Sequence, residues 1–357
     1  MPELWLTLVS KKTSDDAQAG PFSATVQIDP ALESTVILLS YDDTEHPDRS
    51  ITVGIAPELG SNMFRFRAGE RDLIYGEPEL LKRCDFTGNL VLWPLPNRVR
   101  DKRYTYQGHA YSLANVTRPQ GNDVLIHGLV FDRPWRHDPP VLGDDSVTVM
   151  TYIDITPESP RYDAYPFDSR LALTYTLMRE GVRVAYSVEN RGTGDLPFGF
   201  ALHPYFATLS GSANTLVSLP ATEIMEADAE LLPTGRVLRV DGIMYAPFDL
   251  RAPTPVANLK LDHVYTGLRP GADAVIDYRG QGLALRLSAS DDFTHMVIYT
   301  LGGDAFFCLE NQTCATDAVN LYNRGLHELA HLQEVHRGET HTGYVQYTVE
   351  HTSGDCL

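Results

Sequence analysis

The feature of this sequence that most constrains its fold is an alternation of apolar and polar residues with a period of two, repeated in short segments along nearly the whole chain. The clearest example is the pair of segments 170–178 and 182–190, which a turn at 179–181 joins. Every second residue of both segments is apolar, namely Leu171, Leu173, Tyr175 and Leu177, then Val182, Val184, Tyr186 and Val188. Since successive side chains of a strand point to opposite faces, this pattern predicts an antiparallel hairpin with one buried face and a fixed register.

The remaining segments extend this prediction to an all-β fold. Helical spacing of apolar residues is confined to two short stretches, at about 77–83 and 324–335. No Gly/Ser linker or fixed-period repeat interrupts the series of strands, so the sequence predicts one large antiparallel β-sandwich domain over residues 1–357 with few short helices. Further strands are expected at 51–56, 62–67, 147–155, 274–278, 282–288, 294–300 and 343–349.

The charge of the chain narrows its partners. Its 29 Lys and Arg residues against 47 Asp and Glu residues give a net charge of −18. Such a field repels polyanions, so we expect no nucleic acid and no anionic membrane surface as partner, and a neutral small molecule fits better. Residues 1–12 show no basic start before a long apolar stretch, and no later run approaches the ~18 apolar residues of a membrane span. Four scattered cysteines make no disulfide framework, so we expect a cytoplasmic protein that is neither secreted nor inserted in a membrane.

One motif points to a metal. Residues 327–331 (His-Glu-Leu-Ala-His) match the pattern H-E-x-x-H, in which two histidines one helical turn apart bind zinc and the glutamate activates a water molecule. A third ligand is then needed, and Glu350 follows His331 by 350 − 331 = 19 residues. However, Glu350 adjoins the alternating segment 343–349, which leaves no second helix to present it. We therefore interpret the motif as a solvated surface helix that holds no metal, and a zinc hydrolase is the remote alternative.

Five short segments combine an acid, a base or a hydrogen-bonding group with aromatic or proline neighbours. Because proline biases the preceding residue toward extended backbone, His203, which precedes Pro204, is expected to be presented from a strand end. Glu310 follows an apolar run, which places its carboxylate either at the solvent edge of a strand or in a cleft. The segments contain Asn97-Arg98, His127-Gly128, His203-Pro204, Asp262-His263 and Glu310.

Taken together and in this order on an all-β chain, the five segments resemble the aldose 1-epimerase family, the galactose mutarotases. The resemblance runs over about residues 52–348. It implies the family's fold, a large antiparallel galactose mutarotase-like supersandwich with its site in an open cleft. In two places the chain departs from the family pattern. Asn311 occupies a position at which many members have proline, which bears on the geometry of Glu310, and the segment 324–341 is longer than usual, which indicates a decorated loop.

The resemblance implies an activity that interconverts the α and β anomers of a neutral aldose such as glucose or galactose. Glu310 is then the base that takes the proton of the C1 hydroxyl, and His203 is the acid that protonates the ring oxygen. The ring opens, rotates about C1–C2 and closes again without a metal, a nucleotide or another cofactor, and without a covalent intermediate. Because neighbouring opposite charges favour one another, we expect the pair to start as carboxylate and imidazolium.

The resemblance also implies which residues hold the sugar. Arg98 and His127 are expected to hydrogen-bond sugar oxygens, Asp262 is expected to accept from a hydroxyl, and Asn97 is a secondary candidate for the same work. The partner is then a small-molecule monosaccharide, bound by a monomer or a homodimer.

Two further readings use the same fold. A hexose-6-phosphate 1-epimerase needs a cluster of cationic side chains at one end of the cleft, and the chain groups Arg98, Arg100, Lys102 and Arg103. A non-catalytic carbohydrate-binding protein needs hydrogen bonds but no matched acid and base, so Glu310 and His203 are the residues that separate it from an enzyme.

Overall fold

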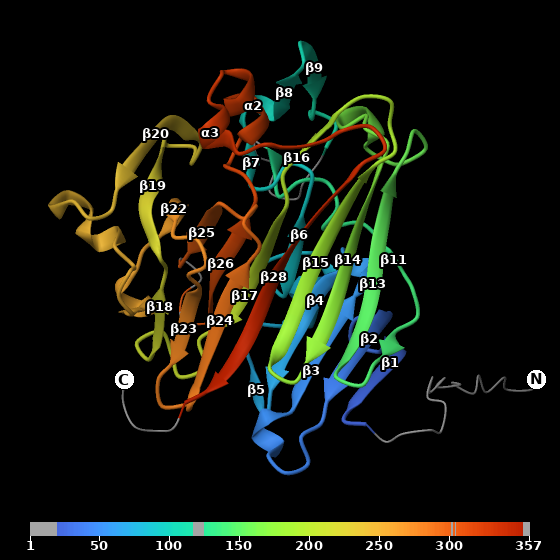
Figure 1. The fold of residues 1–357 in the computed structure, drawn as a ribbon, viewed down its shortest axis with the longest axis vertical. Helices are drawn as coiled ribbons and strands as arrows, with labels where there is room; N and C mark the ends of the chain where they lie inside the picture. The colour runs from blue at the N-terminus through green and yellow to red at the C-terminus, as the bar shows by residue number, and fades with distance from the viewer. Residues whose placement is uncertain (1–19, 117–124, 301–302, 304, 353–357) are drawn as a thin grey trace, which may run out of the picture.

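The computed structural model describes residues 20–116, 125–300, 303 and 305–352, and their antiparallel strands form three large sheets (Figure 1). The five-stranded sheet has the order β1 (Phe22–Asp29), β2 (Ser34–Tyr41), β3 (Ile51–Ala56), β4 (Asn62–Ala68) and β5 (Arg71–Asp72). The seven-stranded sheet has the order β20 (Pro233–Arg239), β19 (Ala221–Ala227), β22 (Asp262–Leu268), β25 (His295–Tyr299), β26 (Phe306–Gln312), β17 (Ala201–Ala207) and β6 (Asn89–Leu92).

The ten-stranded sheet crosses the whole molecule (Figure 1). Its order is β11 (Arg136–His137), β13 (Ser146–Ile155), β14 (Ser169–Met178), β15 (Gly181–Asn190), β28 (Thr340–His351), β24 (Leu283–Ala289), β23 (Ala274–Tyr278), β18 (Thr215–Ser218) and β21 (Thr254–Pro255), with β12 (Val141–Leu142) also paired to β13. Three two-stranded ladders pair β7 (Arg98–Val99) with β10 (Leu125–Ile126), β8 (Arg103–Tyr106) with β9 (His109–Ser112), and β16 (Leu196–Phe198) with β27 (Gln333–Val335).

The hairpin of β14 and β15 confirms the predicted alternation. Its eight apolar positions are all buried, and the register pairs Leu171 with Val188. Gly181 opens β15 with φ 151°, and a Cβ there would lie 1.9 Å from the carbonyl oxygen of Tyr347 on the neighbouring β28. A glycine is therefore required where the hairpin turns against the next strand.

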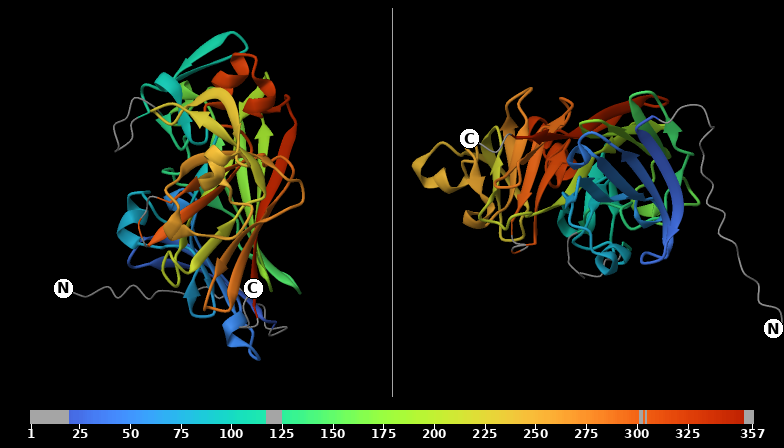
Figure 2. Two further views of the ribbon diagram at one scale, coloured as in Figure 1. Left: turned by 90° about the vertical axis from the view of Figure 1, so that its left-hand side faces the viewer. Right: turned by 90° about the horizontal axis from the view of Figure 1, so that it is seen from below.

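Aromatic side chains join the three sheets into layers, which Figure 2 shows from the side and from below. Tyr347 of the ten-stranded sheet contacts Phe66 of the five-stranded sheet and Phe206 of the seven-stranded sheet, with ring centroids 6.3 and 6.0 Å apart. Tyr186 of β15 stacks on Phe200 at 4.3 Å. These contacts lie in one continuous buried cluster, so the predicted all-β antiparallel sandwich is confirmed.

The other predicted strands coincide with β3, β4, β13, β23, β24, β25 and β28. Helix α1 (Pro78–Lys82) confirms the predicted stretch at 77–83. The predicted helix over 324–335 is wrong, because α2 (Ala318–Asn323) precedes it, α3 (His327–Ala330) is short, and β27 occupies its end. Gly325 and His331 have φ values of 82° and 48°, and these left-handed residues end the helical turn on both sides.

Among the described residues, no helix is long and apolar enough to cross a membrane. Cys308 and Cys314 are buried free thiols, and Cys84 is partly buried. Residues 1–12 and Cys356, on which the expectations about secretion and disulfides partly rest, lie outside the described residues.

Candidate active site

The period of two gives the seven-stranded sheet two different faces. On β26, Phe307 and Leu309 lie in the main core, whereas Phe306 and Cys308 pack in a second cluster on the opposite face. Glu310 shares the face of Cys308, because both occupy even positions of the strand. The carboxylate that follows the apolar run is thus held in a cleft and not at a solvent edge, with 3% of the residue exposed.

His203 lies across from Glu310 on the adjacent strand. The pairs Ala201 with Gln312 and Tyr205 with Cys308 set this register between β17 and β26. The ladder is interrupted at 202–204, where the proline after His203 has no N–H to donate. His203 is extended as predicted, but its predicted place at a strand end is wrong, because it is the third residue of β17.

The two side chains touch. Nε2 of His203 lies 3.2 Å from Oε1 of Glu310, and only 7% and 3% of these side chains are exposed. Burial raises the pKa of the Glu310 carboxyl to about 8, and the negative charge of Asp262 acts in the same direction. Burial also lowers the pKa of the His203 imidazole to about 3, with a further lowering by the positive charge of Arg98.

Burial therefore opposes the expected pair of carboxylate and imidazolium, because it acts against the charged form of each group. The two groups hold one proton between them, and burial favours the form in which Glu310 carries it, since each charged group would lose its hydration. The ion pair is the other tautomer of the same total charge. A shift of this proton along the 3.2 Å contact interconverts the two forms.

Neighbouring side chains fix the orientation of the pair. Nε2 of the fully buried Gln312 donates to Oε2 of Glu310 at 3.3 Å, which also favours the carboxylate. The His203 ring stacks on Tyr205 with centroids 4.6 Å apart and an interplanar angle of 15°. The His127 ring stands perpendicular to His203 at 4.9 Å. Sequence reasoning missed Gln312, although its position two residues beyond Glu310 on the same face was a usable signal.

Arg98 and Asp262 form a second polar pair beside the first. Nη2 of Arg98 lies 3.5 Å from Oδ2 of Asp262, and its Nη1 donates to Oδ1 of Asn97 at 3.1 Å. The Arg98 and Asp262 side chains are 18% and 20% exposed. A guanidinium has five N–H donors and a carboxylate has several lone pairs, so both groups keep capacity for sugar hydroxyls.

A left-handed turn presents His127. His127 and Gly128 have φ values of 66° and 70°, and the N–H of His127 donates to the carbonyl oxygen of Asn97 at 2.8 Å. A Cβ on Gly128 would lie 2.5 Å from the carbonyl oxygen of Trp93. Only a glycine fits this close approach, so Gly128 is required for the turn that brings His127 to His203.

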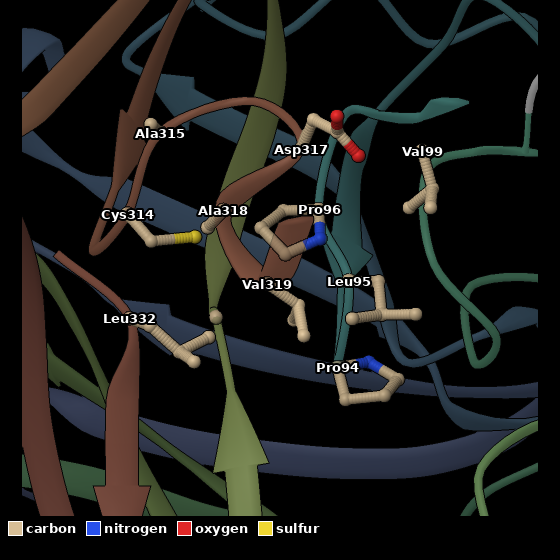
Figure 3. A pocket seen from close by; sticks show the side chains of 11 residues that line it. Pro94, Leu95, Pro96, Val99, Cys314, Ala315, Asp317, Ala318, Val319 and Leu332 are labelled. Carbon is tan, nitrogen blue, oxygen red and sulfur yellow. The ribbon is translucent and has the colours of Figure 1, made fainter. Parts of the chain in front are cut away.

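A small apolar pocket and a buried carboxylate support the strand that carries Arg98 (Figure 3). Pro94, Leu95 and Pro96 face Cys314, Ala318 and Val319 across this pocket. At its edge, the Asp317 N–H donates to the carbonyl oxygen of Arg98 at 3.0 Å, and the Asp317 carboxylate accepts from the backbone N–H of Arg100 at 3.2 Å. Asp317 thus holds the backbone of β7 on both sides of Val99.

The acid–base pair and the polar residues around it line a cavity of about 280 Å³. The structure brings all six predicted site residues together, since Asn97, Arg98, His127, His203, Asp262 and Glu310 all line it. Sequence reasoning missed Cys84, Asp85, Phe86 and Tyr299, which also line it. Phe86 is 43% exposed, and an aromatic residue in the short turn before Gly88 was the signal that could have found this segment.

Three of the four cationic side chains that a hexose 6-phosphate would need face carboxylates. Arg98 faces Asp262, Arg100 pairs with Asp228 at 2.5 Å, and Arg103 lies 3.2 Å from Asp101. These pairs leave little positive field for a phosphate.

The H-E-x-x-H motif lies elsewhere. Both of its histidines are exposed, as predicted, but the motif is helical only over His327–Ala330, and His331 follows α3 in left-handed conformation. Glu350 lies within β28, where its carboxylate accepts from Nε of Arg286 at 2.9 Å, so it does not reach back to α3 as a third ligand. In the part of the chain that the structure describes, no group of three or more His, Cys, Asp or Glu side chains is placed to hold a metal ion.

Comparisons with solved structures bear on the fold. The solved galactose mutarotase-like protein from Clostridium acetobutylicum superposes with a TM-score of 0.80 at 19% identity, covering 93% of this chain and 99% of that one. The galactose 1-epimerase from Lactobacillus acidophilus gives a TM-score of 0.71 at 15% identity, covering 93% and 100%. Identities this low show a shared fold.

Sequence comparison adds a relative and a family. The uncharacterized protein YihR of Escherichia coli strain K12 is 28% identical over 199 residues, which are 55% of this chain and 60% of YihR, so the match spans less than two thirds of that relative. The sequence model described as aldose 1-epimerase matches residues 50–348, which is most of the chain. The chain therefore belongs to the aldose 1-epimerase family.

Proposed function

We propose that this protein is an aldose 1-epimerase that interconverts the α and β anomers of a neutral aldose, such as glucose or galactose, in the cytoplasm. The observation that carries the proposal is the buried contact of 3.2 Å between Glu310 and His203, within a cavity that also offers hydrogen bonds for hydroxyls. A matched acid and base is what anomer exchange requires, whereas a binding protein needs hydrogen bonds alone.

The two tautomers of the pair correspond to the two states of the sugar. In the ion-pair form, the Glu310 carboxylate takes the proton of the C1 hydroxyl while the His203 imidazolium gives its proton to the ring oxygen. The bond from C1 to the ring oxygen breaks and a C1 carbonyl forms, which leaves a carboxylic acid and a neutral imidazole. Burial favours this neutral form, so the site is matched to the open-chain aldehyde. After rotation about C1–C2, the reverse transfers close the ring on its other face.

The direct test is optical rotation. Freshly dissolved α-glucose and α-galactose are expected to reach their equilibrium rotation faster in proportion to added protein. If both sugars bind, as calorimetry would show, while their rotation changes at the uncatalysed rate, the protein is a carbohydrate-binding protein and not an epimerase.

The proton held by the pair predicts a broad pH profile. Above about pH 8 the pair loses this proton from Glu310 and no acid remains, whereas below about pH 3 a second proton binds His203 and no base remains. We therefore expect kcat/KM, corrected for the spontaneous reaction, to be flat between these limits. A decline centred near pH 6.5, the ordinary pKa of histidine, would show instead that His203 titrates as an exposed group.

Charge selectivity separates the proposal from a hexose-6-phosphate 1-epimerase. Because Arg98, Arg100 and Arg103 each face a carboxylate and the net charge is −18, we expect glucose to be turned over with a kcat/KM at least about tenfold higher than that of glucose 6-phosphate. The comparison uses the same assay and ionic strength for both sugars. The reverse order would favour the phosphate enzyme.

Activity is expected to be independent of the H-E-x-x-H motif. His327→Ala and His331→Ala should each leave kcat/KM within about threefold of the parent, and incubation with a strong chelator should not change it, because neither histidine lines the cavity. Zinc at one ion per chain, lost on chelation together with activity, would support the zinc hydrolase instead.

A further inference from the structure

A second cavity of about 220 Å³ adjoins the first and shares three of its lining residues, Asn97, Arg98 and Asp262. The pair of Arg98 and Asp262 is thus a partition between two compartments of similar size. The first compartment contains the acid and base. The second contains neither, and the mechanism of anomer exchange on a single ring makes no use of it.

One wall of the second compartment is aromatic. Phe248 contacts His263 with ring centroids 4.9 Å apart and Tyr245 with centroids 6.4 Å apart. All three residues line the cavity and are partly exposed. Flat rings with an electron-rich face suit the C–H face of a pyranose ring.

Two further carboxylates that line the compartment have their charge balanced by arginines. Asp228 accepts from Nη2 of Arg100 at 2.5 Å, and Glu226 accepts from Nε of Arg236 at 2.7 Å. Each carboxylate retains lone pairs for hydroxyl donors. Among the described residues that line the compartment, Arg98 is the one Arg or Lys side chain, and it faces Asp262. This composition suits a neutral polyol and disfavours a phosphate or sulfonate.

We infer that the second compartment is a subsite for a second, neutral pyranose ring, so that the preferred substrate is a reducing disaccharide. This inference rests on the proposed function. The reducing ring occupies the first compartment with C1 free between Glu310 and His203. The glycosidic bond to the second ring leaves from another carbon and passes the partition of Arg98 and Asp262.

The experiment compares glucose with glucosyl-glucose disaccharides linked 1→2, 1→3, 1→4 and 1→6. At least one linkage isomer is expected to have a kcat/KM about tenfold or more above that of glucose, because the second ring adds contacts on Phe248. Calorimetry on the Glu310→Gln variant, which separates binding from turnover, should show tighter binding of the same isomer. A glucose kcat/KM above that of every disaccharide overturns the inference and leaves the proposed function standing.

Variants locate the effect. Phe248→Ala is expected to lower the ratio of disaccharide to glucose kcat/KM by about tenfold, and Tyr245→Ala should lower it in the same direction. The matched control is Met244→Ala in the same 3-10 segment (Ile243–Phe248), which is 83% exposed, does not line the cavity and should leave the ratio unchanged. An unchanged ratio in Phe248→Ala, a preference for glucose 6-phosphate or a sulfonated glucose, or no turnover of any sugar each overturns the inference, and the last result overturns the proposed function too.

Discussion

Replacing Glu310 by glutamine is expected to lower kcat by roughly 10²-fold or more, while the affinity for the sugar changes little. The amide keeps the size of the side chain and one acceptor oxygen, but it cannot take the proton of the C1 hydroxyl. His203→Asn should cause a loss of similar size from the acid side. Polarimetry at saturating sugar measures kcat, and calorimetry measures affinity.

The double variant and a matched control make this prediction specific. Residues that act as one proton-transfer unit are not additive, so Glu310→Gln with His203→Asn should be little worse than either single variant. Glu350→Gln changes a glutamate in the neighbouring sheet that faces Arg286 and should leave kcat unchanged. If Glu310→Gln kept more than about a third of the parent kcat in a folded protein, Glu310 would not be the base.

Removing either member of the pair of Arg98 and Asp262 is expected to reduce kcat/KM by about 10- to 100-fold, because each forms charge-assisted hydrogen bonds with the sugar in the proposed complex. The same variants should move the alkaline limb of the pH profile in opposite directions. Asp262 raises the pKa of Glu310, whereas Arg98 lowers it. Asp262→Asn should therefore move the limb to lower pH, and Arg98→Ala should move it to higher pH.

Arg98→Lys is the control for this pair of variants. It keeps the positive charge, so the alkaline limb should remain near its parental position, while loss of the planar guanidinium still weakens the hydrogen bonds. Limbs that shift in the same direction for Asp262→Asn and Arg98→Ala would contradict the electrostatic assignment. An unchanged KM in both would contradict their contact with the sugar.

The fold could be predicted from the sequence because strand alternation is a local signal. Wherever apolar and polar residues alternate with a period of two, the apolar positions identify the buried face of the strand. The hairpin shows this alternation in both of its strands, β14 and β15, which have ten residues each. The helix predicted at 324–335 was wrong for a reason that is also local. Left-handed backbone at Gly325 and His331 confines α3 to a single turn. The spacing of apolar residues does not reveal where φ becomes positive.

The residues of the candidate site could be identified from the sequence, but their geometry could not. Its residues come from segments more than 200 positions apart, as Asn97 and Glu310 show, and their ordered motifs identify them without stating any distance. The protonation of the pair also depends on burial, which is a property of packing and cannot be inferred from the sequence. Proximity of Glu310 to His203 suggested two charges, whereas the depth of the pair in the cavity favours none.

The place of β28 in the ten-stranded sheet bears on how the chain reaches its native state. This strand lies between β15 and β24, and Gly181 pairs with Thr348, which lies 348 − 181 = 167 residues later. The two halves of the sheet therefore remain unjoined until residues 340–351 leave the ribosome, and until then β15 and β24 each present an unpaired edge. Such long-range pairing folds slowly and exposes edges to aggregation, so chaperone capacity should control the yield of folded protein.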